Sequence, residues 1–195
     1  MVTRPFRVGR ARADLRRRGA AAVEFAVCLP VLLTIMFGLW EVGRIVEVTN
    51  VMVNGAREGA RDASMGQANL QAVASNVVIY LQSAEPTAFG SGHTTSLITP
   101  VITLPANTYG YTCWDNTANR ELFTVTWTDI TAPTVTDPTA MTQLDRYRIA
   151  ISAPYTSVGW IPVARLTGLT RISTTVDWVS MVDSPFTIAR YLQAE

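Results

Sequence analysis

The stretch Arg16-Arg17-Arg18-Gly19-Ala20-Ala21-Ala22-Val23-Glu24-Phe25 joins a cationic N-terminal segment to the start of a long apolar one. From Ala20 to Trp40, Glu24 is the only carboxylate or basic residue. A helix of that length spans roughly 30 Å at about 1.5 Å per residue, close to the thickness of a bilayer's hydrocarbon core. The sequence therefore predicts one membrane-spanning helix at residues 20–40.

The charges on either side of this segment predict its orientation. Seven arginines precede Gly19, and only Asp14 opposes them. Cationic flanks stay in the cytoplasm, so the C-terminal domain is predicted to lie outside. Removal of residues 1–19 would change the formal net charge from +1 to −5. A nucleic-acid-binding arm is disfavoured, because the arginines lack interleaved aromatic residues and abut an apolar segment.

Beyond the apolar segment the pattern becomes amphipathic. Small and apolar residues recur every three or four positions after Glu41, which predicts that residues 41–84 form a helical spine, with Gly66 as a point of interruption. Gly55 and Gly59 have the spacing of close helix–helix contacts in membranes. The favoured alternative is that this face packs against the protein's own sheet.

Residues 85–195 are rich in threonine, and alternation replaces helical spacing there. The alternating runs around Phe123–Trp127, Tyr147–Ile151 and Ile172–Trp178, with a fourth apolar run at Leu97–Leu104, predict half-buried antiparallel strands. Loops are predicted at Phe89–Thr95, Tyr109–Arg120 and Thr131–Gln143. The expected fold class is α+β: a long N-terminal helix whose distal half packs on a small, mostly antiparallel sheet.

The N-terminus differs from an ordinary secretory signal. Such a signal places its small-residue cleavage site after the apolar core, whereas Gly19 and the alanines here precede it. A cut after Gly19 would leave the helix on the mature protein, with Ala20 as the new amino terminus and Glu24 one helical turn away. Glu24 could then pair with the terminal ammonium of a neighbouring subunit. Alternatively, Glu24 is a simple cap in the first turn of an uncut anchor.

These residues carry a family resemblance. Gly19 followed by Glu24-Phe25 and an apolar run resembles the class III signal of type IV prepilins. With Pro30, Glu41-Val42-Gly43-Arg44 and Ala56-Arg57-Glu58-Gly59-Ala60-Arg61, the pattern resembles TadE-like minor pilins of tight-adherence (Tad/Flp) systems. The resemblance implies a pseudopilin of the bacterial inner membrane that prepilin peptidase cleaves after Gly19. Its implied partners are other pilins, pilus-assembly proteins and the lipid bilayer, with no nucleic acid.

The resemblance also implies site residues and a function. Gly19 and Ala20 are the expected processing site, and Glu24 and Phe25 the expected assembly contacts. The protein would take part in assembly, initiation or the tip of an adhesive pilus. The leader (1–19), transmembrane helix (20–40), helical spine (41–84) and β-rich ectodomain (85–195) are its expected parts. The alternative is an uncleaved single-pass envelope protein whose ectodomain binds a ligand or surface.

Enzymatic signals are sparse, so no catalytic residue, metal or cofactor is predicted. The sole histidine, His93, has no second ligand at metal-binding spacing, and Ser91 lacks a nucleophile motif. Asp177 alternates away from the apolar strand face and is expected to be solvated, with Asp183 the nearest other carboxylate. Without lysine, a phosphate-binding P-loop is excluded.

Two further features leave alternatives open. Cys28 lies in the apolar segment, so a disulfide with Cys113 is not expected, and Cys113 is either buried or an unpaired thiol open to crosslinking. Six aromatic residues of the ectodomain either form its core, which is favoured, or line a carbohydrate or adhesion face. They are Tyr109, Tyr111, Trp114, Trp127, Trp160 and Trp178.

Overall fold

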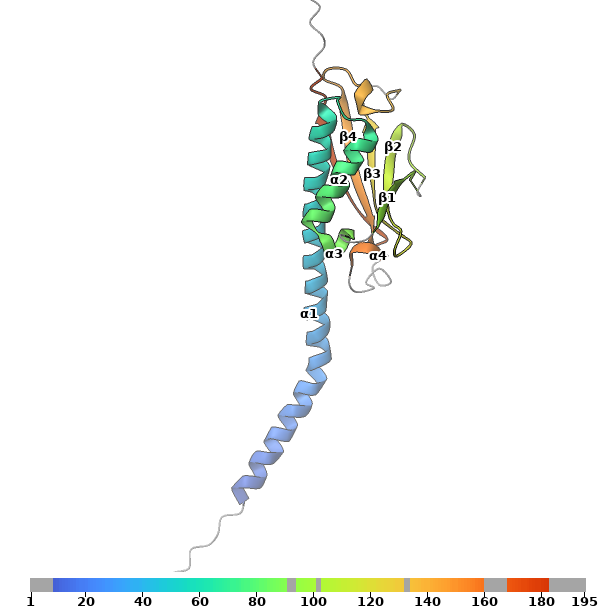
Figure 1. Cartoon of the computed structure of the whole chain (residues 1–195). Coiled ribbons are helices and arrows are strands. Elements are labelled where there is room, and N and C mark those ends of the chain that lie inside the picture. The colour runs from blue at the N-terminus through green and yellow to red at the C-terminus, as the bar shows by residue number, and fades with distance from the viewer. Residues whose placement is uncertain (1–8, 91–93, 101–102, 132–133, 160–167, 183–195) are drawn as a thin grey trace, which may run out of the picture. The chain divides into compact units, whose positions relative to one another are not determined.

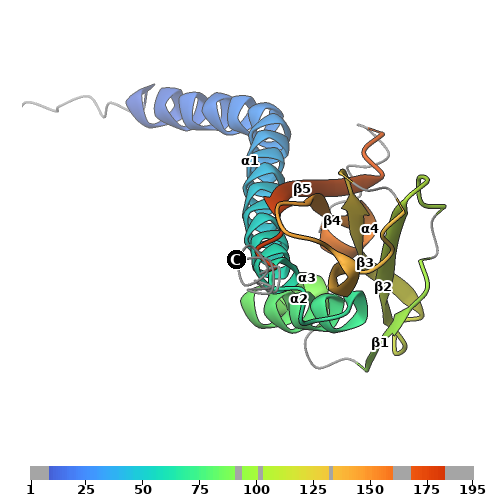
Figure 2. The ribbon, with the colours of Figure 1, turned by 90° about the horizontal axis from the view of Figure 1, so that it is seen from above.

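The computed structural model describes residues 9–90, 94–100, 103–131, 134–159 and 168–182. The chain divides into two compact units, Met1–Gly43 and Arg44–Glu195. The helices are α1 (Gly9–Ser64), α2 (Leu70–Ala84), α3 (Pro86–Phe89) and α4 (Tyr155–Val158), with a 3-10 turn at Pro138–Ala140. The strands are β1 (Thr95–Ile98), β2 (Thr108–Asp115), β3 (Arg120–Asp129), β4 (Arg146–Pro154) and β5 (Arg171–Val179), as labelled in Figures 1 and 2.

The first unit contains the N-terminal part of α1. The helix begins at Gly9, whereas the sequence predicts a leader without a fold of its own up to Gly19. It continues through Pro30, which has no N–H for the carbonyl of Ala26. The hydroxyl of Thr34 donates a hydrogen bond of 2.8 Å to the carbonyl of Pro30. The helix therefore continues past Pro30, and this agrees with the expectation from the sequence of one helix over residues 20–40.

In the second unit the five strands form one antiparallel sheet in the order β1-β2-β3-β4-β5. The α+β class and the antiparallel pairing are confirmed. The prediction of a loop at Tyr109–Arg120 is wrong, because β2 occupies most of it. Gly110 is the reason the strand is easily missed: a Cβ there would lie 2.3 Å from the carbonyl oxygen of Val125, so only glycine fits this close strand pairing.

Other strand limits also differ from the prediction. β1 is shorter than the apolar run Leu97–Leu104, since it ends at Ile98 before Pro100, which cannot donate to a sheet ladder. Residues 101 and 102 lie outside the described residues. β3, β4 and β5 cover the three alternating runs. Within Thr131–Gln143, the described residues contain the 3-10 turn and no strand, in agreement with the predicted loop.

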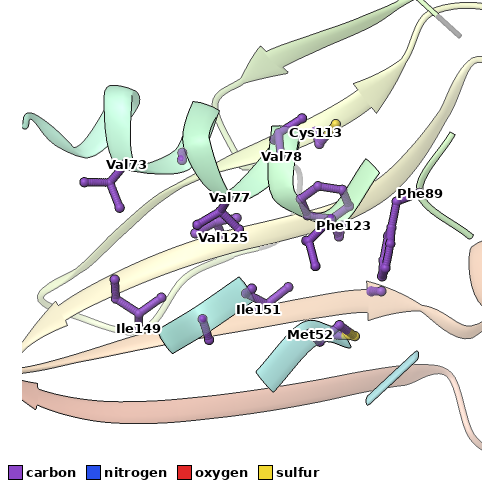
Figure 3. Packing of buried hydrophobic residues seen from close by; sticks show 14 of the residues in the cluster. Met52, Val73, Val77, Val78, Phe89, Cys113, Phe123, Val125, Ile149 and Ile151 are labelled. Carbon is purple, nitrogen blue, oxygen red and sulfur yellow. The ribbon is translucent and has the colours of Figure 1, made fainter. Parts of the chain in front are cut away.

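The core of the second unit lies between one face of the sheet and two helices. The part of α1 after Arg44 and helix α2 both contribute fully buried residues, including Met52 and Val77. Figure 3 shows Val77 and Val78 of α2 close to Val125 and Phe123 of β3. The hydroxyl of Tyr147 in β4 donates a hydrogen bond of 2.5 Å to the carbonyl of Ala60 in α1. The distal part of α1 is thus a structural element of the ectodomain core.

Within the predicted spine over residues 41–84, α1 ends at Ser64 and α2 begins at Leu70, so the interruption expected at Gly66 is the turn of a helical hairpin. Gly66, with φ of +63°, follows the end of α1, and its N–H binds the carbonyl of Ala63. Gly59 lies against Val77, where an added Cβ would approach a methyl group to 2.6 Å, and Gly55 lies against Leu81, where the corresponding distance is 2.9 Å. The small-residue face was expected to pack on the sheet. Gly55 and Gly59 instead allow α2 to run back close along α1.

Candidate membrane and assembly segment

The apolar part of α1 has no protein cover. Its most apolar 18-residue window has a mean hydropathy of 2.2, and none of that window is buried. Large apolar side chains from Val23 to Trp40 are 38–70% exposed. A core helix of comparable hydropathy would bury most of these side chains. By length and composition the helix can cross a membrane once.

The predicted processing residues Gly19 and Ala20 belong to helix α1. The side chains of residues 9–21 are outside the described part of the structure. Gly19 and Ala20 nevertheless stand immediately before the exposed apolar stretch. The structure therefore places the small-residue junction and the apolar helix in one continuous element.

Glu24 and Phe25 lie at the beginning of the exposed stretch. Both side chains are exposed, and Phe25 is 60% accessible. No ion pair joins Glu24 to another described side chain. A carboxylate within a membrane span costs roughly 2.5 to 3.5 kcal/mol near the helix centre on insertion scales, and less towards an end. Glu24 is thus a group for which a partner from outside this chain would be favourable.

An ion-pair cluster that sequence reasoning missed stabilises the start of the second unit. Nη1 of Arg44 lies 2.7 Å from Oε1 of Glu85, and Nη2 donates to the hydroxyl of Thr87 at 2.8 Å. Thr87 in turn donates to the same glutamate oxygen at 2.5 Å. The side chains of Arg44 and Glu85 are only 10% and 12% exposed. The local sequence around Arg44 does not indicate this partner, and only the contact across 41 positions reveals its role.

The electrostatics of this cluster favour the ionised carboxylate. Burial raises the pKa of Glu85, but hydrogen bonds from Thr87 and Arg44 and the nearby guanidinium charge lower it. The net result is a pKa below the ordinary glutamate value. The bridge therefore fixes α1 to the junction of α2 and α3 at neutral pH.

No three His, Cys, Asp or Glu side chains among the described residues are grouped as metal ligands would be. Asp177 is exposed and forms a bidentate pair with Arg148, at 2.6 and 2.9 Å. The remaining residues considered for chemistry, Ser91, His93 and Asp183, lie outside the described part.

The structure distinguishes the two cysteines. Cys28 is exposed on the apolar helix and Cys113 is buried in β2. Burial raises the pKa of the Cys113 thiol to about 12, so it is protonated and unreactive at neutral pH. Of the two expectations for Cys113, a buried thiol is confirmed.

Most of the ectodomain aromatics belong to the core, as favoured from the sequence. Trp127 is fully buried, and Tyr109, Tyr111 and Trp178 are partly buried against the same cluster. Trp114 is half-buried, and Trp160 lies outside the described residues. Tyr109 and Tyr111 also line a surface cleft.

Comparison with known proteins adds one match. The family model described as "TadE-like protein" matches residues 19–61, which begins at Gly19 and ends shortly before the end of α1. No curated protein and no solved structure matches the chain. The TadE-like family comprises components associated with Tad pili and is not known to contain enzymes. Residues 19–61 of this chain are a TadE-like family domain.

Proposed function

We propose that this protein is a minor pilin or pseudopilin that takes part in the assembly, initiation or tip of an adhesive Tad-type pilus. The observation that carries the proposal is that one stretch is both the TadE-like domain and an apolar helix without protein cover. A helix of this kind can reside in the inner membrane before assembly and among the helices of other pilins afterwards.

The proposal includes maturation at the cytoplasmic face of the membrane. Residues 1–19 would serve as a basic leader, and prepilin peptidase would cleave after Gly19 to expose Ala20. The family match begins at Gly19, which supports this position. The arginines before Gly19 would hold the leader in the cytoplasm, so residues 85–195 would face the outside.

Glu24 and Phe25 are proposed as assembly contacts. After cleavage, the ammonium of Ala20 and the carboxylate of Glu24 would lie one helical turn apart in the same helix. Between neighbouring helices in a low-dielectric environment, the carboxylate of one subunit and the ammonium of the next attract strongly. Exposed Phe25 would pack against the neighbouring helix beside this pair.

The experiment compares Glu24→Leu with Glu47→Leu in cells that produce the pilus. Glu47 is a matched control, because it is an exposed glutamate further along the same helix. We expect both variants in the membrane fraction and only Glu24→Leu to be absent from sheared pili. Equal incorporation of both variants would contradict the assembly role and favour the alternative, an uncleaved single-pass envelope protein whose ectodomain binds a ligand or surface.

A further inference from the structure

The ectodomain contains an open cleft of about 380 Å³ that the pilin function does not use. It lies between the start of β2, the β1–β2 connection and the segment before the 3-10 turn. Its lining combines aromatic and apolar side chains with polar ones. The main lining residues are Tyr109, Tyr111, Pro100, Leu104, Thr136 and Asp137.

The cleft exists because β1 covers only part of β2. β1 pairs with Thr112–Asp115, so its register stops short of the stretch Thr108–Tyr111. Tyr109 and Tyr111 lie two positions apart, which places them on the same face of the strand. Both rings are partly buried against the core and yet line the cleft. The start of β2 thus places two partly buried aromatic rings along the cleft.

Polar groups that line the cleft can form further hydrogen bonds. Oδ1 of Asp137 accepts bonds from the N–H and hydroxyl of Thr139, while Oδ2 accepts one from the N–H of Leu70 at 3.0 Å. A carboxylate oxygen has two lone pairs, so Oδ2 can accept a further bond. Neither tyrosine hydroxyl makes a hydrogen bond within the described part of the chain, and Thr136 is exposed.

Asp137 is ionised at neutral pH. Burial raises its pKa, but hydrogen bonds from the backbone of Leu70 and from Thr139 lower it, and the net pKa is below the ordinary aspartate value. Among the described residues that line the cleft, none is basic. A phosphate or another anion would therefore meet a negative charge without a compensating cation.

We propose that this cleft binds a pyranose ring of a neutral saccharide. Such a ring has apolar C–H faces that pack on tyrosine rings, and a rim of hydroxyls that donate to carboxylates and bond with threonine and tyrosine hydroxyls. An extended peptide that adds to the sheet fits less well, since only Thr108–Tyr111 extend beyond β1 and the N–H of Thr108 already binds the carbonyl of Pro105.

The test uses the full chain in detergent and three soluble, neutral probes: maltotriose, cellotriose and N,N′,N″-triacetylchitotriose, titrated by calorimetry and by saturation-transfer NMR. The three probes represent three sources of a pyranose ring: α-glucans, β-glucans and polymers of N-acetylated amino sugars. Open surface clefts bind single saccharides weakly, so we expect a Kd of about 1 mM for at least one probe. No saturable binding by any of the three would overturn the proposal.

Variants locate the binding site. Tyr111→Ala should weaken binding about tenfold or more, and Tyr111→Phe should retain most of it because the ring remains. If Tyr111→Ala fails to fold, Thr136→Trp tests the same site. Thr136 is exposed, so a tryptophan there should be tolerated by the fold and should block the opening of the cleft. Thr117→Trp is its control, in the exposed turn between β2 and β3. Saccharide binding that Thr136→Trp leaves unchanged would place the site elsewhere and refute the proposal.

Discussion

Two methionines on α1 show how one helix serves two environments. Met36 lies in the stretch before Gly43 and is 51% exposed, whereas Met52 is fully buried in the ectodomain core. Both belong to an unbroken helix, so secondary structure does not distinguish them. What differs is the source of apolar contacts. For Met52 it is the protein's own α2 and sheet, and for Met36, on the proposed function, it is lipid or other subunits. Changes in the two stretches should therefore affect different measurements.

The largest expected contrast comes from truncating these two side chains. Met52→Ala should lower the free energy of unfolding of the ectodomain by about 2–5 kcal/mol, because it leaves a cavity in a packed core. Met36→Ala should leave that free energy unchanged. Chemical denaturation of the full chain in detergent, followed by the circular dichroism signal of the sheet, measures both. Equal destabilisation would show that the first stretch also packs on the ectodomain.

The second prediction concerns the helical hairpin. Gly59→Ala should destabilise the ectodomain by about 1–3 kcal/mol, since the new methyl group would overlap Val77. Gly43→Ala is the matched control on the same helix, because nothing lies within 4 Å of an added Cβ there. That control should be neutral or slightly stabilising through helix propensity. Thermal melting distinguishes the two, and a stabilised Gly59→Ala variant would contradict the close α1–α2 contact.

A smaller effect, dependent on pH, is expected at the Arg44–Glu85 bridge. Because the folded-state pKa of Glu85 is lowered, its stabilisation is fully present above the ordinary value of 4.5 and is lost as the pH falls through the folded-state value. Glu85→Gln should cost about 1.5 kcal/mol at pH 7. The difference from the wild type should shrink in acid. A difference that stays constant down to strongly acidic pH would show that the bridge contributes no charge-dependent stability.

The smallest expected change is the loss of one buried hydrogen bond. Tyr147→Phe removes the donor to the carbonyl of Ala60 and should reduce stability by about 1 kcal/mol. Tyr80→Phe, on a partly buried tyrosine of α2, should change it by less. The midpoints of denaturant unfolding, compared between variants with equal m-values, give the two losses of stability. A larger loss in Tyr80→Phe than in Tyr147→Phe would contradict the stabilising role of the Tyr147 hydrogen bond.

The parts of the fold that were predictable depend on local patterns. Continuous hydropathy from Ala20 to Trp40 identified the apolar helix, and alternation at Phe123, Val125 and Trp127 identified β3. The strand β2 was missed because Gly110 and its polar neighbours indicate a loop. Alternation of Tyr109, Tyr111 and Cys113 was the available signal.

What could not be predicted depends on contacts between distant residues. The reversal of the helix after Ser64 places Gly59 against Val77, and no local pattern says whether a small-residue face meets a sheet, a helix or another subunit. The same holds for Arg44 in α1, whose partner Glu85 lies beyond the end of α2. For the assembly segment, the sequence supplied Gly19, Ala20, Glu24 and Phe25, and their proposed roles depend on molecules outside this chain.

The most direct test of the central claim is the intact mass and N-terminal sequence of the protein from membranes of cells with and without prepilin peptidase. The account predicts a mature chain that begins at Ala20 when the peptidase is present and retains residues 1–19 when it is absent. A chain that begins at Met1 or Val2 in both strains would contradict the pseudopilin proposal and leave a membrane-anchored ectodomain.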